Sequence, residues 1–460
     1  MASKPSIPKG TRDFSTDEMQ KRDHIFDTIK EVFKFYGYQP IETPAMENLT
    51  TLLGKYGDEG DRLIFRILNS GNFLSDTSDE DLNEKDTGKL ASLICEKGLR
   101  YDLTVPFARY VVQHRDEITF PFKRYQIQPV WRADRPQKGR YREFFQCDVD
   151  IIGSDSLLNE YELIKIIDDV FAGLGIKVMI RINNRKILLG IAEYIGESSR
   201  ITDITVAIDK LEKIGHDAVN TELKEKGIPS GAIEKLNPLM KLKGDINEQL
   251  LKLEKILSGS AIGTAGLNEM KALFSYIRDG NISAAVDFDI TLARGLDYYT
   301  GAIIEVKSAD FDIGSICGGG RYDDLTGIFG LEGVSGVGIS FGADRIYDVM
   351  SHLNLFKEIT SPPVDVLILN FGSEETKYAL GILMKVRELG IKAELYPDAV
   401  KLKKQMSYAN TRGIPYIIIA GEDEIKGNEV TIKIMSSGVQ EKISLKNLDT
   451  YFLPIINNQT

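Results

Sequence analysis

The chain has 460 residues, of which 42% are hydrophobic and 27% charged, which is typical of a globular protein with room for two or three domains. Its formal net charge of −11 argues against indiscriminate nucleic-acid binding, which requires a broadly basic surface. Three cysteines without a CxxC pair, four scattered histidines and the lack of any ~20-residue apolar run exclude a disulfide framework, a thiolate zinc site and a membrane span, so we expect an unexported, cytoplasmic protein without a dedicated metal site.

The first part of the chain predicts one long helix followed by short extended segments. Residues 17–36 place apolar side chains at helical spacing, and Gly37 ends the pattern. Residues 38–44 indicate a strand entry between prolines, and the apolar run 63–68 predicts a short strand. Residues 70–88 are rich in Ser, Asp, Glu, Asn and Gly, so we expect a flexible acidic loop.

A β-hairpin with a basic loop is predicted next. Residues 122–132 and 143–152 have strand character, and the connection 133–142 contains Pro136 and Gly139. The segment 123–142 carries one acid, Asp134, against the basic residues Lys123, Arg124, Arg132, Arg135, Lys138, Arg140 and Arg142. Such a local patch can bind phosphate in spite of the negative net charge, because the affinity depends on how many lysine and arginine side chains contact the phosphates.

The remaining chain predicts a helical insertion and a second domain. After a helix at 157–174 and a strand at 177–182, residues 200–280 are Lys/Glu/Leu-rich and helical in period. Glycine-rich β-type runs return at 290–342, and a helix follows at 342–353. Ser361-Pro-Pro363 indicates a linker. Strands and helices alternate beyond it, which predicts a small α/β domain with a mixed sheet and, without a G-x-G-x-x-G after its first strand, no dinucleotide site.

Three arginines have positions that suit a triphosphate. Arg132 ends a predicted strand, Arg294 lies in a glycine-flanked turn, and Arg345 begins a predicted helix. Arginine grips phosphate with two parallel hydrogen bonds and keeps its charge, and glycines such as Gly318–Gly320 permit close backbone approach. The alternative for any single arginine is a surface salt bridge.

A second group of polar residues suits an amino-acid substrate. Asp102, Gln146 and Asp150 offer acceptors for an ammonium group, and the pair Tyr298-Tyr299 could bracket an imidazole together with Asp150. Ordinary polar strand positions are the alternative for these residues taken alone.

The segments in combination resemble the histidyl-tRNA synthetase family of class II aminoacyl-tRNA synthetases, over nearly the whole chain from Lys9 onward. Residues 292–301 (LARGLDYYTG) and 318–325 (GGGRYDDL) look like the two histidine signatures of that family. Residues 36–44, 122–152 and 336–346 look like class II motifs 1, 2 and 3. The resemblance implies an α+β catalytic domain with an antiparallel sheet and helices (1–200 and 286–355), a helical insertion (201–285) and a C-terminal α/β anticodon-binding domain with a mixed sheet (364–460).

The resemblance also implies residue roles. The ATP-binding residues would be Arg132 and Arg294 at the α-phosphate, Arg345 at the γ-phosphate, Phe144 stacked on adenine, and Arg140 and Glu143 near the nucleotide. Arg132 and Arg294, the catalytic pair, would also contact histidine. The remaining histidine-binding residues would be Asp102, Thr104 and Gln146 at the amino group, and Asp150, Tyr299 and Tyr322, with Tyr298 adjacent, at the imidazole.

The implied reaction is activation of L-histidine by ATP to histidyl-adenylate, followed by transfer to the 3′ end of tRNA(His). Motif 1 implies a homodimer, and Mg²⁺ would be held through the phosphates rather than by a protein cage. For tRNA the best local signal is Lys401, Lys404, Tyr408 and Arg412 on one helix face, since basic and aromatic groups suit single-stranded RNA. A solvated helix face is the alternative.

Three rival functions remain to be weighed. A non-enzymatic paralogue, such as a regulatory subunit of ATP phosphoribosyltransferase, usually lacks catalytic residues or the anticodon-binding domain, whereas both are present in this sequence. A class II synthetase for threonine, proline or glycine would not carry the Arg294-Gly-Leu-Asp-Tyr-Tyr299 run. A plain RNA-binding module predicts no glycine–arginine constellation.

Overall fold

The computed structural model describes residues 4–293, 298–357 and 362–457. The chain divides into two compact units, Met1–Lys357 and Glu358–Thr460, and each is treated by itself. Within the described part of the chain, no helix combines the length and the apolar composition needed to cross a bilayer.

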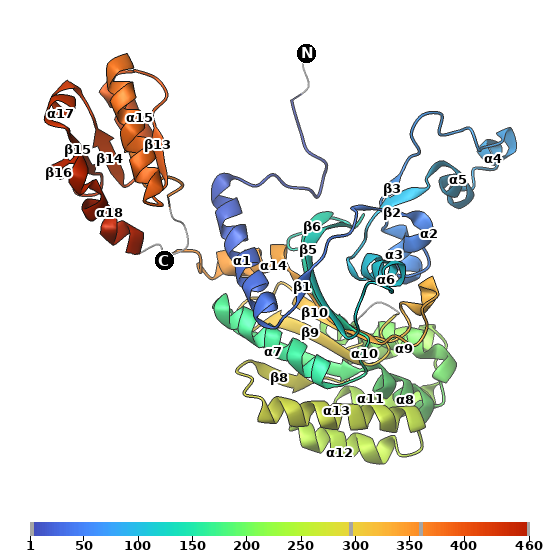
Figure 1. Cartoon of the computed structure of the whole chain (residues 1–460). Coiled ribbons are helices and arrows are strands. Elements are labelled where there is room, and N and C mark those ends of the chain that lie inside the picture. Colours follow the sequence, from blue (N-terminus) through green and yellow to red (C-terminus); the bar gives the residue numbers. More distant parts are fainter. Residues whose placement is uncertain (1–3, 294–297, 358–361, 458–460) are drawn as a thin grey trace. The chain divides into compact units, whose positions relative to one another are not determined.

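An eight-stranded sheet forms the centre of the first unit (Figure 1). Its strand order is β1-β5-β6-β11-β10-β9-β7-β8. The inner neighbours from β5 to β7 are antiparallel, as expected, whereas β1 joins β5 and β8 joins β7 in parallel, which makes the sheet mixed. The strands are β1 (Gln39–Pro40), β5 (Phe122–Trp131), β6 (Glu143–Ile152), β7 (Val178–Asn184), β8 (Ala285–Phe288), β9 (Ala302–Ser308), β10 (Ser315–Tyr322) and β11 (Gly336–Gly342).

The two faces of this sheet differ in chemistry because side chains alternate along each strand. One face carries the buried apolar residues of β6 and β11, and it packs under α1 (Thr16–Phe35), α7 (Leu158–Gly173) and α14 (Ala343–His352). Phe341 of β11 lies 5.8 Å from Phe33 of α1 and 5.6 Å from Phe171 of α7 between ring centroids. The opposite face carries polar residues and glycines, namely Arg124 and Gln126 of β5, Gln146, Asp148 and Asp150 of β6, and Gly336, Gly338 and Ser340 of β11.

Helix α1 confirms the amphipathic helix that the sequence predicts at 17–36. It begins with a capping box, in which the Glu18 backbone N–H donates to Ser15 Oγ and the Ser15 backbone N–H donates to the Glu18 carboxylate. Its apolar stripe, Ile25, Ile29 and Phe33, is fully buried. At roughly 1.5–3 kcal/mol for each large apolar side chain, this burial fixes the helix to the sheet.

A smaller three-stranded sheet lies in the order β2-β4-β3, with β2 (Met46–Asn48), β3 (Arg66–Ile67) and β4 (Lys97–Leu99). The expected strand at 63–68 is reduced to β3, because α3 (Gly57–Arg62) and its C-cap occupy the residues before it. Two further helices of this region are α2 (Leu49–Leu52) and α6 (Thr104–Gln113).

The expected acidic loop at 70–88 is wrong in part, because helices form there. The chain contains α4 (Asp79–Glu84) and α5 (Thr87–Ile94). Ser78 and Asp81 form a capping box on α4, and the Asp86 carboxylate accepts from the first backbone N–H groups of α5. Each cap adds ~1 kcal/mol to a helix end, which offsets the polar composition that predicts a loop.

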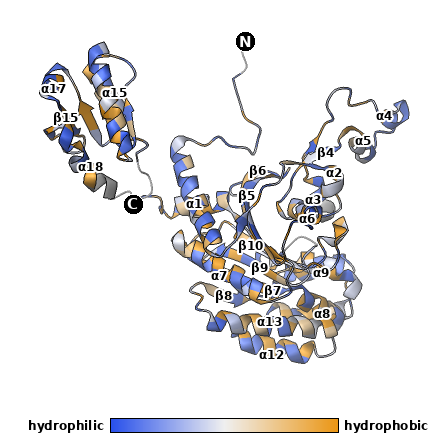
Figure 2. Ribbon diagram, in the orientation of Figure 1, coloured by the Kyte–Doolittle hydropathy of each residue, from blue (hydrophilic) through white to orange (hydrophobic). Residues whose placement is uncertain are grey.

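Helices fill the region between β7 and β8, as predicted for residues 200–280. They are α8 (Arg185–Ile195), α9 (Ile201–Ile208), α10 (Leu211–Glu225), α11 (Ser230–Met240), α12 (Ile246–Ile256) and α13 (Ala261–Asp279). Figure 2 shows polar and apolar residues alternating along α12 and α13, as expected of half-exposed helices. Gly190 and Gly263 let α8 and α13 approach closely, since a Cβ at Gly263 would lie 3.1 Å from the Gly190 Cα. These helices belong to the compact unit Met1–Lys357, so a separate domain at 201–285 stays a prediction.

The second unit is a five-stranded mixed sheet with flanking helices, as the sequence predicts. Its order is β13-β12-β14-β15-β16, in which β12 pairs in parallel with β13 and β14, and the other pairs are antiparallel. The strands are β12 (Val366–Ile368), β13 (Ala393–Leu395), β14 (Tyr416–Ile419), β15 (Glu429–Ile434) and β16 (Gln440–Ser444). The helices are α15 (Ser373–Glu388), α16 (Leu402–Thr411), α17 (Glu422–Gly427) and α18 (Leu448–Asn457). The sequence pattern missed β16 and α17.

Candidate active site

A cavity of about 350 Å³ lies over the polar face of the large sheet, beside the loop that joins β5 to β6. Arg132 and Arg345 both line it, so the structure brings two of the three predicted phosphate-binding arginines together. Arg294 lies outside the described residues. The other lining residues include Arg140, Tyr141, Phe144, Gln146, Gly318, Ser340 and Asp344.

Arg132 is held at the cavity wall by its neighbours. Its Nε donates to the Tyr101 carbonyl at 3.1 Å, and its guanidinium carbon lies 4.2 Å from the Tyr101 ring centroid and 5.1 Å from that of Phe144. Stacking on two rings fixes the plane of the guanidinium, which favours bidentate binding of an oxyanion.

Arg345 lies in the first turn of α14 and is oriented by backbone carbonyls. Its Nε donates to the Gly139 carbonyl at 2.7 Å, and its Nη1 donates to the Ser315 carbonyl at 2.6 Å. The adjacent Asp344 carboxylate accepts from Arg22 Nη1 at 2.6 Å and from the Phe145 backbone N–H at 2.9 Å. These bonds anchor the start of α14 to α1 and β6, so Arg345 is presented from a rigid element.

Next to this cavity, Asp150 belongs to a buried cluster of carboxylates and phenols, which is named the acidic pocket for the ligand proposed below. Its Oδ1 accepts from the Tyr322 hydroxyl at 2.6 Å, and its Oδ2 forms an ion pair with Arg124 Nη2 at 2.8 Å. Only glycine fits the two facing positions of β11, because a Cβ at Gly338 would overlap the Asp150 carboxylate and one at Gly336 would overlap the Tyr322 ring. These two glycines therefore make room for the side chains of Asp150 and Tyr322, a role that the sequence analysis did not assign to them.

Asp102 forms the other side of the pocket. Its Oδ1 accepts from the Tyr56 hydroxyl at 2.9 Å and from the Val105 backbone N–H at 3.2 Å, and its Oδ2 accepts from the Tyr298 hydroxyl at 3.4 Å. The Tyr299 ring packs edge-on against Tyr298, with 4.9 Å between ring centroids. The predicted residue Thr104 begins α6, two residues after Asp102.

Strand β6 connects the cavity to the pocket. Phe144, Gln146 and Asp150 lie on one face of the strand, where alternate residues are ~7 Å apart. Gln146 Nε2 donates to Ser340 Oγ at 2.7 Å, whereas its buried Oε1 has no hydrogen-bond partner among the described residues. A buried amide oxygen without a donor favours a ligand that supplies one, such as an ammonium group.

Burial sets the protonation of these groups. It raises the pKa of Asp102 and Asp150, and it raises the pKa of the Tyr298 and Tyr322 hydroxyls well above their ordinary value. The phenols are therefore neutral hydrogen-bond donors at physiological pH.

Sequence reasoning missed Tyr56, Asp148 and Ser340, and it placed Arg124 in a basic patch for phosphate, whereas Arg124 is buried and forms an ion pair with Asp150. The period-two alternation of Gln146, Asp148 and Asp150 in β6 was a signal for Asp148, since it assigns all three side chains to one face. Arg124 required the hairpin register that pairs it with Asp150, and Tyr56 required the tertiary fold.

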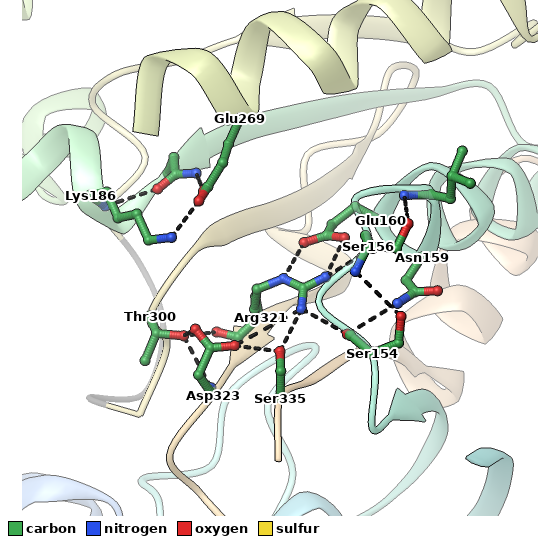
Figure 3. Close-up of polar contacts among 12 residues, drawn as sticks. Ser154, Ser156, Asn159, Glu160, Lys186, Glu269, Thr300, Arg321, Asp323 and Ser335 are labelled. Carbon is green, nitrogen blue, oxygen red and sulfur yellow. Dashed lines mark hydrogen bonds and ion pairs between the residues drawn. The ribbon is translucent and has the colours of Figure 1, made fainter. Parts of the chain in front are cut away.

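A buried ion pair beneath the pocket holds the end of β10. Figure 3 shows the Arg321 guanidinium between Glu160 of α7 and Ser335, and its Nε and Nη2 each donate to the Glu160 carboxylate at 2.6 Å. Ser335 Oγ donates to Asp323, which in turn accepts from Thr300 Oγ1 at 2.6 Å. Tyr322 is thus fixed from the other face of the strand, and Thr300 ties the segment after Tyr299 to it.

The other predicted residues occupy more peripheral positions. Arg140 pairs with Asp134 at 2.9 Å at the cavity edge, and the exposed Glu143 accepts from the Trp131 indole N–H at 2.7 Å. In the second unit, Lys401 and Lys404 are exposed at the start of α16. Further along that face, Tyr408 packs edge-on against Tyr396, with 5.2 Å between ring centroids, and Arg412 forms an ion pair with Glu394 at 3.1 Å.

Comparisons with known proteins match nearly the whole chain to one family. Residues 10–346 match the family model described as histidyl-tRNA synthetase, and residues 365–453 match the anticodon binding domain. The chain is 60% identical over 448 residues to the histidine–tRNA ligase of Bacteroides fragilis, covering 97% of this chain and 99% of that protein. It is 58% identical over 440 residues to that of Porphyromonas gingivalis, covering 96% and 97%.

Solved structures show the same arrangement. The crystal structure of histidyl-tRNA synthetase from Nostoc sp. PCC 7120 superposes with a TM-score of 0.81 at 29% identity and covers 100% of both chains. An ATP phosphoribosyltransferase regulatory subunit/histidyl-tRNA synthetase from Bacillus halodurans C has a TM-score of 0.72 at 20% identity, covering 91% of this chain and 100% of that one, and shows likeness of fold alone.

Proposed function

Because the chain belongs to the histidyl-tRNA synthetase family and joins histidine to tRNA, we propose that ATP occupies the arginine-lined cavity and histidine the adjoining acidic pocket. The observation that carries this proposal is that Arg132 and Arg345 line one cavity, and that β6 leads from it directly to Asp150.

In the proposed first step the substrate carboxylate attacks the α-phosphorus of ATP. A carboxylate oxygen–phosphorus bond forms, the bond from that phosphorus to the bridging oxygen breaks, and pyrophosphate leaves with the bridging oxygen. Negative charge builds on phosphate oxygens, where fixed guanidinium groups stabilise it most. Arg132 and Arg294 would contact the α-phosphate and Arg345 the γ-phosphate, with Phe144 against adenine and Arg140 and Glu143 nearby.

The same proposal assigns the histidine contacts. Asp102, Thr104 and the unpaired Gln146 Oε1 would take the ammonium group. Asp150, Tyr299 and Tyr322 would surround the imidazole, with Tyr298 adjacent. A pocket whose polar groups are paired by bound histidine would reject apolar amino acids strongly, because an apolar side chain would leave those groups unpaired.

Magnesium would enter with ATP and screen the phosphates. The carboxylates that line the cavity fit this arrangement only loosely, since Asp134 pairs with Arg140 and Asp344 with Arg22. The phosphate oxygens would therefore supply most of the ligands, as is usual for Mg²⁺.

The second step would move the histidyl group to the 3′ end of tRNA(His), in the cytoplasm. The anticodon-binding domain would hold the tRNA through the α16 face of Lys401, Lys404, Tyr408 and Arg412. The chain would act as a homodimer, as the resemblance of residues 36–44 to class II motif 1 implies.

An amino-acid panel in ATP–pyrophosphate exchange tests this function. We expect histidine to support exchange and the other amino acids, including threonine, proline and glycine, to support it ~10⁴-fold less well. Equal exchange with another amino acid, or none with histidine, would contradict the proposal.

A further inference from the structure

Asp148 is a buried carboxylate of the pocket whose hydrogen-bonding capacity is not filled. It is 2% exposed, and its Oδ1 has no hydrogen-bond partner in the described part of the chain, although the side chain is bonded to Ser340. Asp150 Oδ2 also lacks a hydrogen bond but forms an ion pair with Arg124, Asp150 Oδ1 accepts from Tyr322, and both oxygens of Asp102 accept hydrogen bonds. An unsatisfied buried carboxylate oxygen is costly, which points to a ligand that satisfies it.

The position of Asp148 is central to the site. It lies on β6 between Gln146 and Asp150, with Ser340 of β11 opposite it on one side and Gln126 of β5 on the other. Two of these neighbours, Gln146 and Ser340, also line the cavity. In the next strand of the same face, Gly318 pairs with Ser340, adds no side chain and also lines the cavity.

The charges around Asp148 also favour a ligand that donates a hydrogen bond. Arg124 is the cation that interacts with both Asp148 and Asp150, and its ion pair is with Asp150. Two buried carboxylates therefore share one guanidinium, and burial raises the pKa of Asp148 to about 7. A ligand N–H placed against Asp148 would restore the balance.

We propose that Asp148 accepts a hydrogen bond from a ring N–H of the substrate histidine and so determines specificity for imidazole. This inference rests on the proposed function. The ring is the assigned partner because Asp102 and Gln146 already offer acceptors to the ammonium group. Asp150, whose charge is paired with Arg124, then supports the ring through Tyr322.

The substitution Asp148→Asn in the full-length chain tests the proposal, since it keeps the shape and removes the carboxylate. We expect the KM for histidine in pyrophosphate exchange to rise ~10–100-fold, the effect of one hydrogen bond to a charged group, while the KM for ATP changes less than ~2-fold. Titration calorimetry with 3-(imidazolyl)propionate, which lacks the amino group, should show the same fold loss of affinity as histidine.

The control is Asp168→Asn on α7, a buried aspartate that accepts from the Ser283 and Ala284 backbone N–H groups outside the pocket. It should leave the KM for histidine within ~2-fold of wild type, as expected of a site without substrate contact. An unchanged KM in Asp148→Asn, or a loss confined to histidine with the propionate unaffected, would overturn the ring assignment. Asp148→Ser, which also lacks the carboxylate, decides the matter if the asparagine variant fails to fold. Wild-type exchange with histidine reports separately on the proposed function.

Discussion

At the scale of single residues, the site concentrates buried groups that cost stability. Asp102, Asp148 and Asp150 are all buried, and burial raises the pKa of each. Protein interiors disfavour such charges unless they are paired, and Arg124 is paired with only one of them. The expected compensation is substrate binding, which supplies the missing donors.

The cost of Asp148 should appear as a pH dependence of stability. Its pKa is about 7 in the folded chain against 3.8 as the ordinary value, so between these pH values the folded state binds more protons than the unfolded state. Stability from this group is therefore full below pH ~4 and falls as the pH rises toward 7. The groups that act on Asp148 are Arg124, Asp150 and Asp102.

Asp148→Asn should consequently stabilise the protein at high pH only. Without ligand, we expect its thermal unfolding midpoint to exceed that of wild type by ~2–5 °C at pH 8, for a gain of roughly 2–4 kcal/mol from the raised pKa, and to equal it at pH 4, where the wild-type carboxyl is protonated. Calorimetric scans at the two pH values measure the difference. A variant less stable than wild type at pH 8 would contradict this account of the carboxylate.

At the scale of elements, the Glu160–Arg321 pair joins α7 to the end of β10. Both side chains are at most 5% exposed. Removal of one partner leaves the other charged and buried, which costs ~3–5 kcal/mol. Because the pair fixes the strand that carries Tyr322, we expect the loss to affect the pocket as well as the fold.

Glu160→Ala should therefore lower the free energy of unfolding by ~3–5 kcal/mol in urea titrations, whereas Glu160→Gln, which keeps one acceptor oxygen, should cost less. Glu31→Ala on the exposed side of α1 serves as the control and should stay within ~0.5 kcal/mol of wild type. A loss under ~1 kcal/mol in Glu160→Ala would show that the pair does not support β10.

Helices and strands with regularly spaced apolar residues could be predicted from the sequence. Elements that depend on local helix caps, or that lie exposed at a sheet edge, could not. Helix α1 and the hairpin β5–β6 follow from apolar spacing and from a loop with proline and glycine. Helices α4 and α5 form through local caps at Ser78 and Asp86 within polar sequence, and the exposed strand β16 has no apolar run to reveal it.

The same distinction holds for the site. Arg132 and Arg345 stand in recognisable motifs, and the structure brings them to one cavity. The pairing of Arg124 with Asp150 depends on a register that a one-residue shift would destroy, since a shift moves every side chain to the other face. Partners across strands are therefore beyond what one sequence predicts.

At the scale of the whole molecule, we expect the two units to serve different steps of the reaction. The residues that form the candidate site for histidine activation in the described part of the chain belong to the first unit. Recognition of tRNA is expected to involve the second unit, where Lys401 and Lys404 are exposed on α16. Changes on α16 should therefore separate the two half-reactions.

The double substitution Lys401→Glu/Lys404→Glu tests that separation. We expect the KM for tRNA in the charging reaction to rise ~10-fold or more, because two cations proposed to contact phosphate become anions. The salt dependence of log KM should weaken by ~0.7 for each lost contact with single-stranded RNA. Pyrophosphate exchange, which needs no tRNA, should stay within ~2-fold of wild type.

Lys377→Glu on α15, a lysine of the same unit with 73% side-chain exposure, is the matched control and should leave both reactions unchanged. If the double variant charges tRNA like wild type, the α16 face is a solvated surface and the tRNA contact lies elsewhere.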